Sequence, residues 1–224
     1  MSRPRPCSGE RPGLIPTAEW KRKATGVPWQ KGETLVAGIG QGYVLATPLQ
    51  LAVMAARVAT GRAIKPHLVH AVVANGDVRP VGNPDFALMH ISPESLQVVH
   101  DGMNAVTNVP GGTAFAARIK EKGWEMAGKT GTSQVRRISK HERETRVLKN
   151  EERPWKERDH ALFVAFAPVD APRYACSIVI EHGGGGSAVA APIARDILRE
   201  ALRRDPATRD DDKSITARAG STPT

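Results

Sequence analysis

The sequence predicts an α/β (α+β) fold in which helices flank a mostly antiparallel sheet. Three observations lead to this fold class. Two segments begin with the hydroxyl-then-proline signal of a helix start, two apolar runs are separated by turn signals, and a helical pattern follows a run of glycines. The 224 residues, of which 40% are hydrophobic, suffice for one domain with a sizeable core.

The first predicted helix begins at Pro48, after a Thr47 cap, and stops at Gly61. A second helix starts with the same signal at 92–93 and runs to about Val106. Their apolar stripes, which we assign to the core, consist of Leu51, Met54, Ala55 and Val58 in the first helix and Leu96, Val99 and Met103 in the second.

The sheet is predicted from three apolar or alternating segments. After the glycines at 111–112 we expect a short helix and then a strand that contains Lys129. The runs 161–166 and 174–180 form an antiparallel pair that extends the sheet from the Lys129 strand. In the Lys129 strand, alternation puts Trp124, Met126 and Gly128 on one face and Glu125, Ala127 and Lys129 on the other.

The remaining segments complete the organisation. Glycines 183–186 are interpreted as a turn into a final helix over 190–202. We expect residues 1–8 to be an unstructured leader, 9–204 to form the domain and 205–224 to be a disordered tail.

Residues 123–133 carry the chain's most informative motif, which fits two kinds of functional site. Gly123 to Thr130 has the spacing G-x-x-x-x-G-K-T of a phosphate-binding loop. Lys129-Thr130-Gly131 is also the K-T-G triplet that penicillin-recognising serine acyl-transferases carry on an active-site strand.

Local context favours the strand over the phosphate loop. A phosphate loop leaves a buried strand at its first glycine and opens a helix at its lysine. Here residues 116–122 are polar and helix-like, and Thr132 to Val135 suit a strand. In a strand, Lys129 is predicted to point into a cleft. The Thr130 and Thr132 hydroxyls suit a carboxylate, and Gly131 leaves room for a substrate backbone. An edge strand with an exposed lysine and a bulge glycine is the structural alternative.

Several ordered motifs together resemble the transpeptidase domain of class B penicillin-binding proteins. The likeness covers roughly residues 9 to 204 and is greatest to the penicillin-binding protein 2 group, the cell-elongation enzymes of Gram-negative bacteria. The motifs are Pro16 to Lys21, Gly38-Ile39-Gly40-Gln41-Gly42, Ala46 to Ala52, Ala127 to Thr132, the strand pair from His160 to His182, and the glycines that follow it. The resemblance implies a partial penicillin-binding/β-lactamase-like fold.

Two of the three motifs that this family's chemistry needs do not occur in the sequence. None of the serines has a lysine at the third following position, so the serine–lysine nucleophile pair is missing. No serine or tyrosine has an asparagine two residues on. We therefore expect the chain to be a fragment that is inactive alone. A non-catalytic module that binds D-Ala-D-Ala or β-lactam carboxylates is the alternative, and a phosphate-loop NTPase is a distant one.

The resemblance assigns roles to the remaining motif. Lys129 would hold positive charge beside the acyl-transfer centre. Thr130 and Thr132 would bind the terminal carboxylate of a stem peptide or β-lactam, with Gly131 between them. The Thr132 N–H would supply half of an oxyanion hole.

Composition narrows the remaining classes of function. The net charge is +9, but the basic residues form no clean stripe, because acidic residues interleave with them between Arg136 and Arg158. We therefore expect a solvated loop over this segment and no nucleic-acid partner. No metal or cofactor is predicted, because His141-Glu142 is not followed by a second histidine at 145. With no apolar run of about 18 residues and no signal peptide, the chain as written is expected to be cytoplasmic. The family itself works at the periplasmic face of the inner membrane, with rod-shape membrane proteins as partners.

Overall fold

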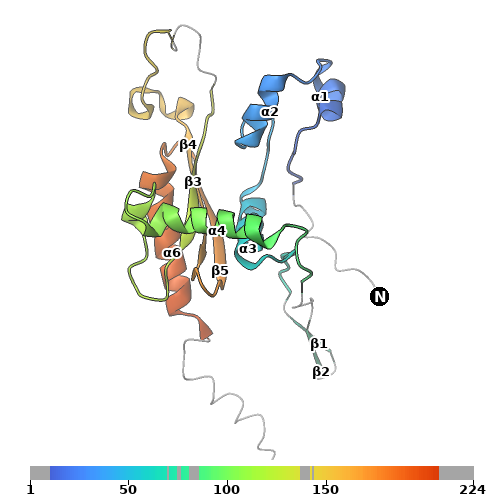
Figure 1. Ribbon diagram of the computed structural model, residues 1–224, viewed down its shortest axis with the longest axis vertical. Coiled ribbons are helices and arrows are strands. Elements are labelled where there is room, and N and C mark those ends of the chain that lie inside the picture. Colours follow the sequence, from blue (N-terminus) through green and yellow to red (C-terminus); the bar gives the residue numbers. More distant parts are fainter. Residues whose placement is uncertain are drawn as a thin grey trace, which may run out of the picture. The chain divides into compact units, whose positions relative to one another are not determined.

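The computed structural model describes residues 11–206 except 70, 75–76, 81–85, 137–141 and 143. The chain divides into two compact units, residues 1–91 and 92–224 (Figure 1). The expected leader at 1–8 and residues 207–224 of the expected tail lie outside the described residues. Asp205, the first residue of that expected tail, is buried and forms an ion pair with Arg173. The extent of a single domain over 9–204 therefore stays a prediction.

The first unit contains three helices. These are α1 (Ala18–Thr25), α2 (Lys31–Gly38) and α3 (Pro48–Thr60). Helix α3 confirms the predicted bounds, because Thr47 accepts a hydrogen bond from the Gln50 N–H and the Gln50 side chain accepts one from the Thr47 N–H. Helices α1 and α2 had not been predicted, since both are short and each is polar along much of its length.

A buried ion pair joins α1 to α2. The Lys21 ammonium, only 4% exposed, donates to the Glu33 carboxylate at 2.7 Å and to the Pro28 carbonyl at 2.9 Å. The backbone N–H of Gln30, together with Lys21, holds the pKa of Glu33 below its usual value. Strands β1 (Ala71–Ala74) and β2 (Asp77–Pro80) form an antiparallel pair later in this unit.

The second unit is built on an antiparallel sheet with strand order β3-β4-β5. The strands are β3 (Ala127–Ser133), β4 (His160–Ala167) and β5 (Tyr174–Ile180). Both predicted relations are confirmed, because β4 pairs with β5 and the strand that contains Lys129 extends the sheet on the other side of β4. The strand begins three residues later than the alternation from Trp124 had indicated.

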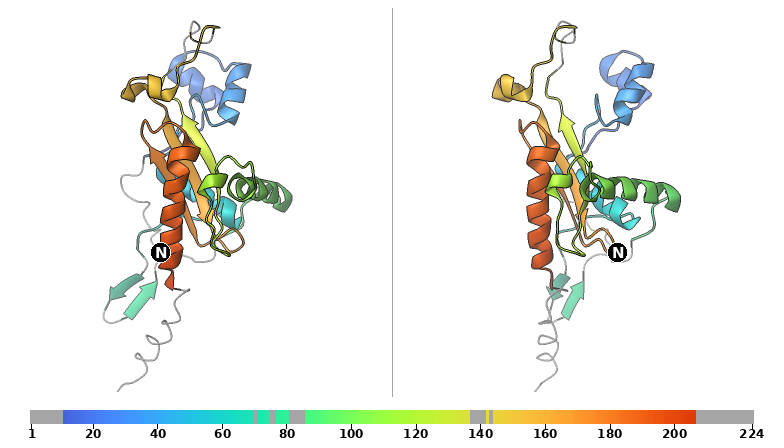
Figure 2. Two further views of the ribbon diagram at one scale, coloured as in Figure 1. Left: turned by 90° about the vertical axis from the view of Figure 1, so that its left-hand side faces the viewer. Right: turned by 60° about the vertical axis from the view of Figure 1, so that its left-hand side comes forward.

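Two helices cover opposite faces of this sheet (Figure 2). Helix α4 (Pro93–Asn108) continues two residues past the predicted end, and α6 (Ala191–Arg203) closes the described fold. The expected short helix before β3 is a single 3₁₀ turn, η1 (Phe115–Ala117). A π-helical segment, η4 (Gly186–Ala190), precedes α6, so the last of the predicted turn glycines is already helical.

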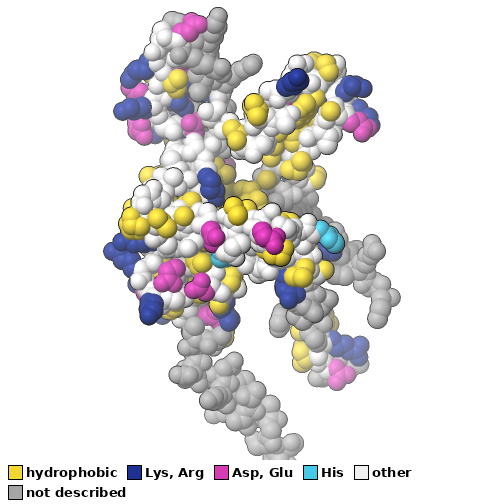
Figure 3. Space-filling view, in the orientation of Figure 1, with side chains coloured by type: hydrophobic (Ala, Val, Ile, Leu, Met, Phe, Trp, Pro, Cys, Tyr) yellow, Lys and Arg dark blue, Asp and Glu magenta, His cyan; other side chains and the backbone are white. Residues whose placement is uncertain are grey.

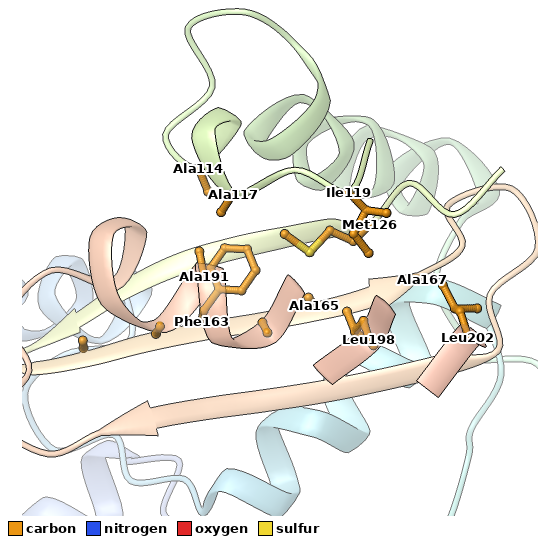
Figure 4. Close-up of a cluster of buried hydrophobic side chains, with 13 residues drawn as sticks. Ala114, Ala117, Ile119, Met126, Phe163, Ala165, Ala167, Ala191, Leu198 and Leu202 are labelled. Carbon is orange, nitrogen blue, oxygen red and sulfur yellow. The ribbon is translucent and has the colours of Figure 1, made fainter. Parts of the chain in front are cut away.

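The hydrophobic core of the second unit lies between the sheet and α6 (Figure 4). Phe163 of β4 and Met126, the residue before β3, are fully buried, and Leu198 of α6 belongs to the same cluster. Alanines supply much of the rest, which lets the helix approach the sheet closely. The complete cluster consists of Ala114, Ala117, Ile119, Met126, Ala161, Phe163, Ala165, Ala167, Ala190, Ala191, Ala194, Leu198 and Leu202.

The segment between β3 and β4 corrects the expectation of a solvated charged loop. It contains two 3₁₀ turns, η2 (Asn150–Glu152) and η3 (Trp155–Glu157). Arg153 is buried and pairs with the buried Asp159 carboxylate at 3.2 Å. Its guanidinium also donates twice to the Leu148 carbonyl. A segment rich in charged residues thus contains a buried ion pair, because a buried arginine requires a partner.

Charged side chains of both signs lie on the surface of each unit. On the face of the molecule in Figure 3, basic and acidic side chains lie interspersed within each unit and form no continuous basic band. Across the described parts of the chain, no helix has both the length and the apolar character needed to cross a membrane.

Candidate functional site

The four residues predicted for the site lie in the middle and end of β3. Lys129 pairs with Val164, and Gly131 pairs with Leu162 in the antiparallel register. Residues directly opposite each other in such a ladder point to the same face of the sheet. Lys129 and Gly131 therefore belong to one face, while Thr130 and Thr132 belong to the face that α6 covers further along the strand.

Strand β3 is the edge of the described three-stranded sheet. Its neighbour β4 occupies one side, and the order β3-β4-β5 leaves the other side without a strand. An edge strand offers backbone N–H and C=O groups to an extended ligand, which can add to the sheet as a further strand. The position of the motif is therefore suited to holding a peptide.

The start of β3 is fixed by buried hydrogen bonds from α4. The Thr107 hydroxyl, in a fully buried residue, donates to the Met126 carbonyl at 2.5 Å. The Asn108 side-chain amide donates to the same oxygen at 2.9 Å. Such bonds hold a strand firmly, since breaking one leaves a buried polar group unpaired.

Lys129 is exposed and lies free of carboxylates. Its ammonium donates to the Thr130 carbonyl oxygen at 2.8 Å, and among the described residues it forms no ion pair. A lysine without a fixed acidic partner keeps its positive charge available to an anionic ligand.

Two hydroxyls approach each other on the opposite face of the strand from Lys129. The Thr113 and Thr130 hydroxyls lie 3.5 Å apart, and Thr132 is exposed further along the strand. Thr113 is brought there by the turn after α4, where a side chain at Gly112 would come within 2.3 Å of the Ala105 carbonyl oxygen. In the sequence, this turn only separates two elements, and nothing in its spacing relative to β3 identifies Thr113 as a neighbour of the motif.

Packing within the sheet leaves little room for a side chain at Gly131. A Cβ at this position would lie 3.2 Å from the Leu162 Cβ. The backbone of Gly186 also lies against it, because a Cβ on Gly186 would come within 2.5 Å of the Gly131 carbonyl oxygen. Gly131 therefore meets a tight approach of protein backbone. That it also makes room for a substrate stays a prediction.

Three aromatic side chains gather at the end of β3. His160 pairs with Ser133 in the ladder, and its ring lies 4.7 Å from that of His182. The His182 ring in turn lies 4.3 Å from Trp155, measured between centroids. In the sequence, His160 and His182 only mark the limits of a strand pair, and their contact depends on the β4–β5 register.

The phosphate-loop interpretation does not match this geometry. Lys129 and Thr130 lie inside a β-strand, whereas a phosphate loop opens a helix at these positions. Gly123 sits in a turn with φ of 81°, and no strand ends there among the described residues. Nor does the described part of the chain hold a group of three or more His, Cys, Asp or Glu side chains that could bind a metal ion.

Two cavities lie away from the motif. They have volumes of about 440 and 350 Å³ and adjoin each other between the segment 116–124 and α6. Their charged walls include Glu121 and Arg199, which pair with each other. They contain none of the residues of the Lys-Thr-Gly motif, so they add nothing to the candidate site.

Cys176 is poorly suited to act as a nucleophile. It is half-buried in β5, and burial raises the pKa of its thiol to about 11. A thiol of this kind stays protonated at neutral pH and reacts slowly.

The fold and the position of the motif agree with the family to which the chain belongs. Residues 7–199 match the family described as penicillin binding protein transpeptidase domain, so the chain is a member of the penicillin-binding proteins. Within this family it is PBP2-like, because its similarity to MrdA and PBP2 proteins extends over most of the chain.

This chain spans less than half of the length of each of three similar proteins. Peptidoglycan D,D-transpeptidase MrdA of Haemophilus influenzae is 38% identical over 189 residues, which is 82% of this chain and 28% of that protein. The solved PBP2 of Pseudomonas aeruginosa in complex with WCK 5153 is 35% identical with a TM-score of 0.69, over 92% of this chain and 41% of that one. PBP2 of Helicobacter pylori, solved in complex with MreC, is 30% identical with a TM-score of 0.69, over 88% and 32% respectively.

Proposed function

We propose that this chain supplies the carboxylate-binding strand of a peptidoglycan D,D-transpeptidase domain. The observation that carries the proposal is the placement of Lys129, Thr130 and Thr132 on an exposed edge strand. Two hydroxyl donors and an unpaired cation suit the terminal carboxylate of a D-Ala-D-Ala peptide or of a β-lactam. The names of the MrdA relatives support this class of substrate.

The proposed roles are those that the family resemblance implies for these residues. Thr130 and Thr132 bind the carboxylate, and Lys129 adds positive charge. Gly131 lets the ligand backbone approach, and the Thr132 N–H forms half of an oxyanion hole for the acyl carbonyl. The other half, and the serine that attacks, belong to motifs that these 224 residues do not contain. We therefore infer that the chain binds such ligands without becoming acylated.

Binding of a short peptide tests this proposal. The chain is titrated with D-Ala-D-Ala while the backbone amide signals of β3 are followed by NMR. The double variant Thr130→Val, Thr132→Val should lose about tenfold or more in affinity, as expected when two hydrogen bonds to a charged group are removed. Valine suits a strand, so folding is retained. Thr60→Val, an exposed threonine of α3, is the control and should bind unchanged.

Incubation with a fluorescent penicillin tests the inference that no acyl-enzyme forms. After denaturation, no label should remain on the chain. A covalent label that survives denaturation would show that a nucleophile is present after all, and its position in the sequence would identify that residue.

The family also suggests partners and a location for the whole protein. The solved complex of Helicobacter pylori PBP2 with MreC supports a rod-shape protein as partner. Work at the periplasmic face of the inner membrane is implied by the family resemblance. Co-purification of a full-length homologous protein with its rod-shape partner, with and without residues equivalent to this chain, would test whether this region takes part.

A phosphate-loop NTPase is the distant alternative, and a simple measurement addresses it. Addition of ATP with Mg²⁺ should leave the melting temperature of the chain unchanged, because Lys129 lies within a strand and cannot close a phosphate cradle there. A rise in melting temperature that Lys129→Ala abolishes would favour the alternative.

A further inference from the structure

The outer side of strand β5 has no partner strand in the described part of the chain. The sheet order β3-β4-β5 places β5 at one edge of the sheet and β3 at the other (Figure 4). Apart from its pairing with β4, the backbone from Tyr174 to Val179 forms no further backbone hydrogen bond among the described residues. Alternate residues of an antiparallel edge strand direct their N–H and C=O groups away from the neighbouring strand. Strand β5 therefore presents a row of unpaired backbone groups.

The sequence of β5 lacks the features that protect such an edge. Natural edge strands carry charged residues, prolines or bulges, which hinder pairing with another chain. The residues from Tyr174 to Ile180 include no charge and no proline, and they pair with β4 one to one, without a bulge. Strand β3, in contrast, contains Lys129 and the glycines 128 and 131. Of the two edges, β5 is the one suited to pairing with a further strand.

The sequence of β5 is complementary to itself in antiparallel order. When two copies of the strand pair about Ser177, every other residue of β5 faces an apolar residue of the second copy. The facing pairs are Tyr174 with Ile180, Ala175 with Val179, and Cys176 with Ile178. Apolar and aromatic cross-strand pairs stabilise a sheet, so this register favours association of two copies.

Opposite charges flank the strand at matching positions. Arg173 precedes Ser177 by as many residues as Glu181 follows it, so the same register places Arg173 of each copy beside Glu181 of the other. Glu181 is exposed, and its carboxylate forms no ion pair within the described part of the chain. Arg173 binds the buried Asp205 carboxylate at 2.8 Å, yet its side chain remains 48% exposed. The two ends of the paired strands would therefore each gain an ion pair.

The centre of the strand carries a buried hydroxyl without a partner. Ser177 Oγ is inaccessible to water and forms no hydrogen bond with any described residue. Leaving a buried hydroxyl unpaired is unfavourable. Side chains directly opposite each other in an antiparallel pair have Cβ atoms about 4.5–5.5 Å apart. Rotation about χ1 would then bring two Ser177 hydroxyls within hydrogen-bonding distance, so each copy supplies the partner that the single chain lacks.

We propose that β5 is the interface through which two copies of this chain form a two-fold symmetric dimer. The two β5 strands pair antiparallel with Ser177 at the symmetry axis, and the two three-stranded sheets join into one continuous sheet. This interface uses the edge of the sheet opposite to β3. It leaves the Lys129 strand open and does not depend on the proposed function.

The association of the whole chain in solution tests this interface. Sedimentation velocity over a wide range of concentrations should show a monomer–dimer equilibrium. Glu181→Lys should raise the dimer dissociation constant about five- to tenfold, because two attractive cross-strand pairs become repulsive. Glu151→Lys makes the same change of charge at another exposed glutamate and should alter the constant by less than about twofold. Circular dichroism of both variants should match that of the unchanged chain.

Disulfide cross-linking tests the register. In a chain with Cys7→Ser and Cys176→Ala, the further change Ser177→Cys should give a covalent dimer on oxidation, since residues at the symmetry axis lie within disulfide reach. Val179→Cys in the same background is the control. Residue 179 faces Ala175 of the second copy, so the two introduced thiols lie about 13 Å apart along the strands and should not cross-link.

Three outcomes would overturn the proposal. The first is a chain that stays monomeric at every concentration. If hydrogen exchange in such a monomer showed all β5 amides protected, another segment of the same chain would cover this edge. The second is a dimer whose dissociation constant Glu181→Lys leaves unchanged. The third is cross-linking at position 179 as efficient as at 177. Either of the last two results would show that the copies meet through a different surface or register.

Discussion

Gly128 illustrates how one absent side chain determines the position of the strand that carries the motif. The sequence drew attention to Gly131, because it lies inside the Lys-Thr-Gly triplet. The structure shows a tighter requirement at Gly128, where a Cβ would come within 2.5 Å of the Phe163 ring and 2.7 Å of the Val164 carbonyl oxygen. Phe163 is fully buried and crosses directly over this glycine. The ring and the strand can both stay in place only if position 128 has no side chain.

We therefore expect Gly128→Ala to lower the free energy of unfolding by about 1–3 kcal/mol, the range found for overpacked cores. Urea denaturation, followed by circular dichroism, measures this change. Gly102→Ala is the matched control. Its Cβ meets nothing within 4 Å on α4, so it should raise the free energy of unfolding by roughly 0.5–1 kcal/mol. An unchanged urea midpoint for Gly128→Ala would show that Phe163 moves aside at little cost.

Individual residues also show how much of the candidate site could be predicted from the sequence. Lys129, Thr130, Gly131 and Thr132 were identified from a short motif, because the chemistry of that motif is contained in consecutive positions. Thr113 and His182 were not, since each approaches the strand through a turn whose course depends on distant packing. Motif analysis finds residues that are adjacent in sequence. Residues that are adjacent only in space need the register of the sheet.

Hydrogen bonds connect the end of helix α4 to the start of strand β3. The C-terminal turn of α4 supplies Thr107 and Asn108, and both donate to the carbonyl of Met126, the residue before β3 begins. On the same side of the sheet, His100 of α4 lies 5.1 Å from the Phe166 ring. The helix was predicted from its Ser92 cap and its apolar stripe. Its polar end, which anchors the strand, carried no separate signal in the sequence.

Thr107→Val should weaken this anchor, because a methyl replaces a fully buried hydroxyl donor. The expected loss in the free energy of unfolding is about 1–2 kcal/mol, as one buried bond is removed while Asn108 still satisfies the carbonyl. Amide hydrogen exchange in β3 should become faster than in β5 of the same variant. Thr107→Ser keeps the hydroxyl and should restore most of the protection. Equal exchange in valine and wild-type chains would argue that Asn108 alone holds the strand.

The two units of the chain differ in how they bury apolar side chains. The entire buried cluster around Phe163 lies between residues 114 and 202, within the second unit. The first unit leaves large apolar side chains exposed in α2 and directly after it, with Leu35 76% and Ile39 75% exposed. A self-contained core favours independent folding, whereas exposed apolar helices do not.

We expect residues 92–206, produced alone, to unfold cooperatively in urea. Tryptophan fluorescence and circular dichroism should report the same midpoint, as two-state unfolding requires. Residues 11–91 alone should show no cooperative transition, because their helices bury few apolar residues. If 92–206 is instead unfolded or aggregated, the core between the sheet and α6 would need the first unit for its stability.

Much of the architecture could be predicted from the amino-acid sequence because its signals are local. Caps, periodicity or alternation within about a dozen neighbouring residues predict four features. These are helix α3, helix α4, the β4–β5 pair and the strand that contains Lys129 to Thr132. Such signals arise from backbone geometry and from which face of an element is apolar. They act wherever the segment is placed.

The arrangement around the motif depended instead on long-range contacts. The buried Arg153–Asp159 pair inside an apparently solvated loop, the approach of Thr113 to Thr130, and the meeting of His160 with His182 each join residues through turns and strand register. Their energies arise from burial and hydrogen-bond satisfaction, which exist only once the chain has packed. Local pattern therefore specified the elements and the Lys-Thr-Gly motif, while packing specified which further side chains lie near it.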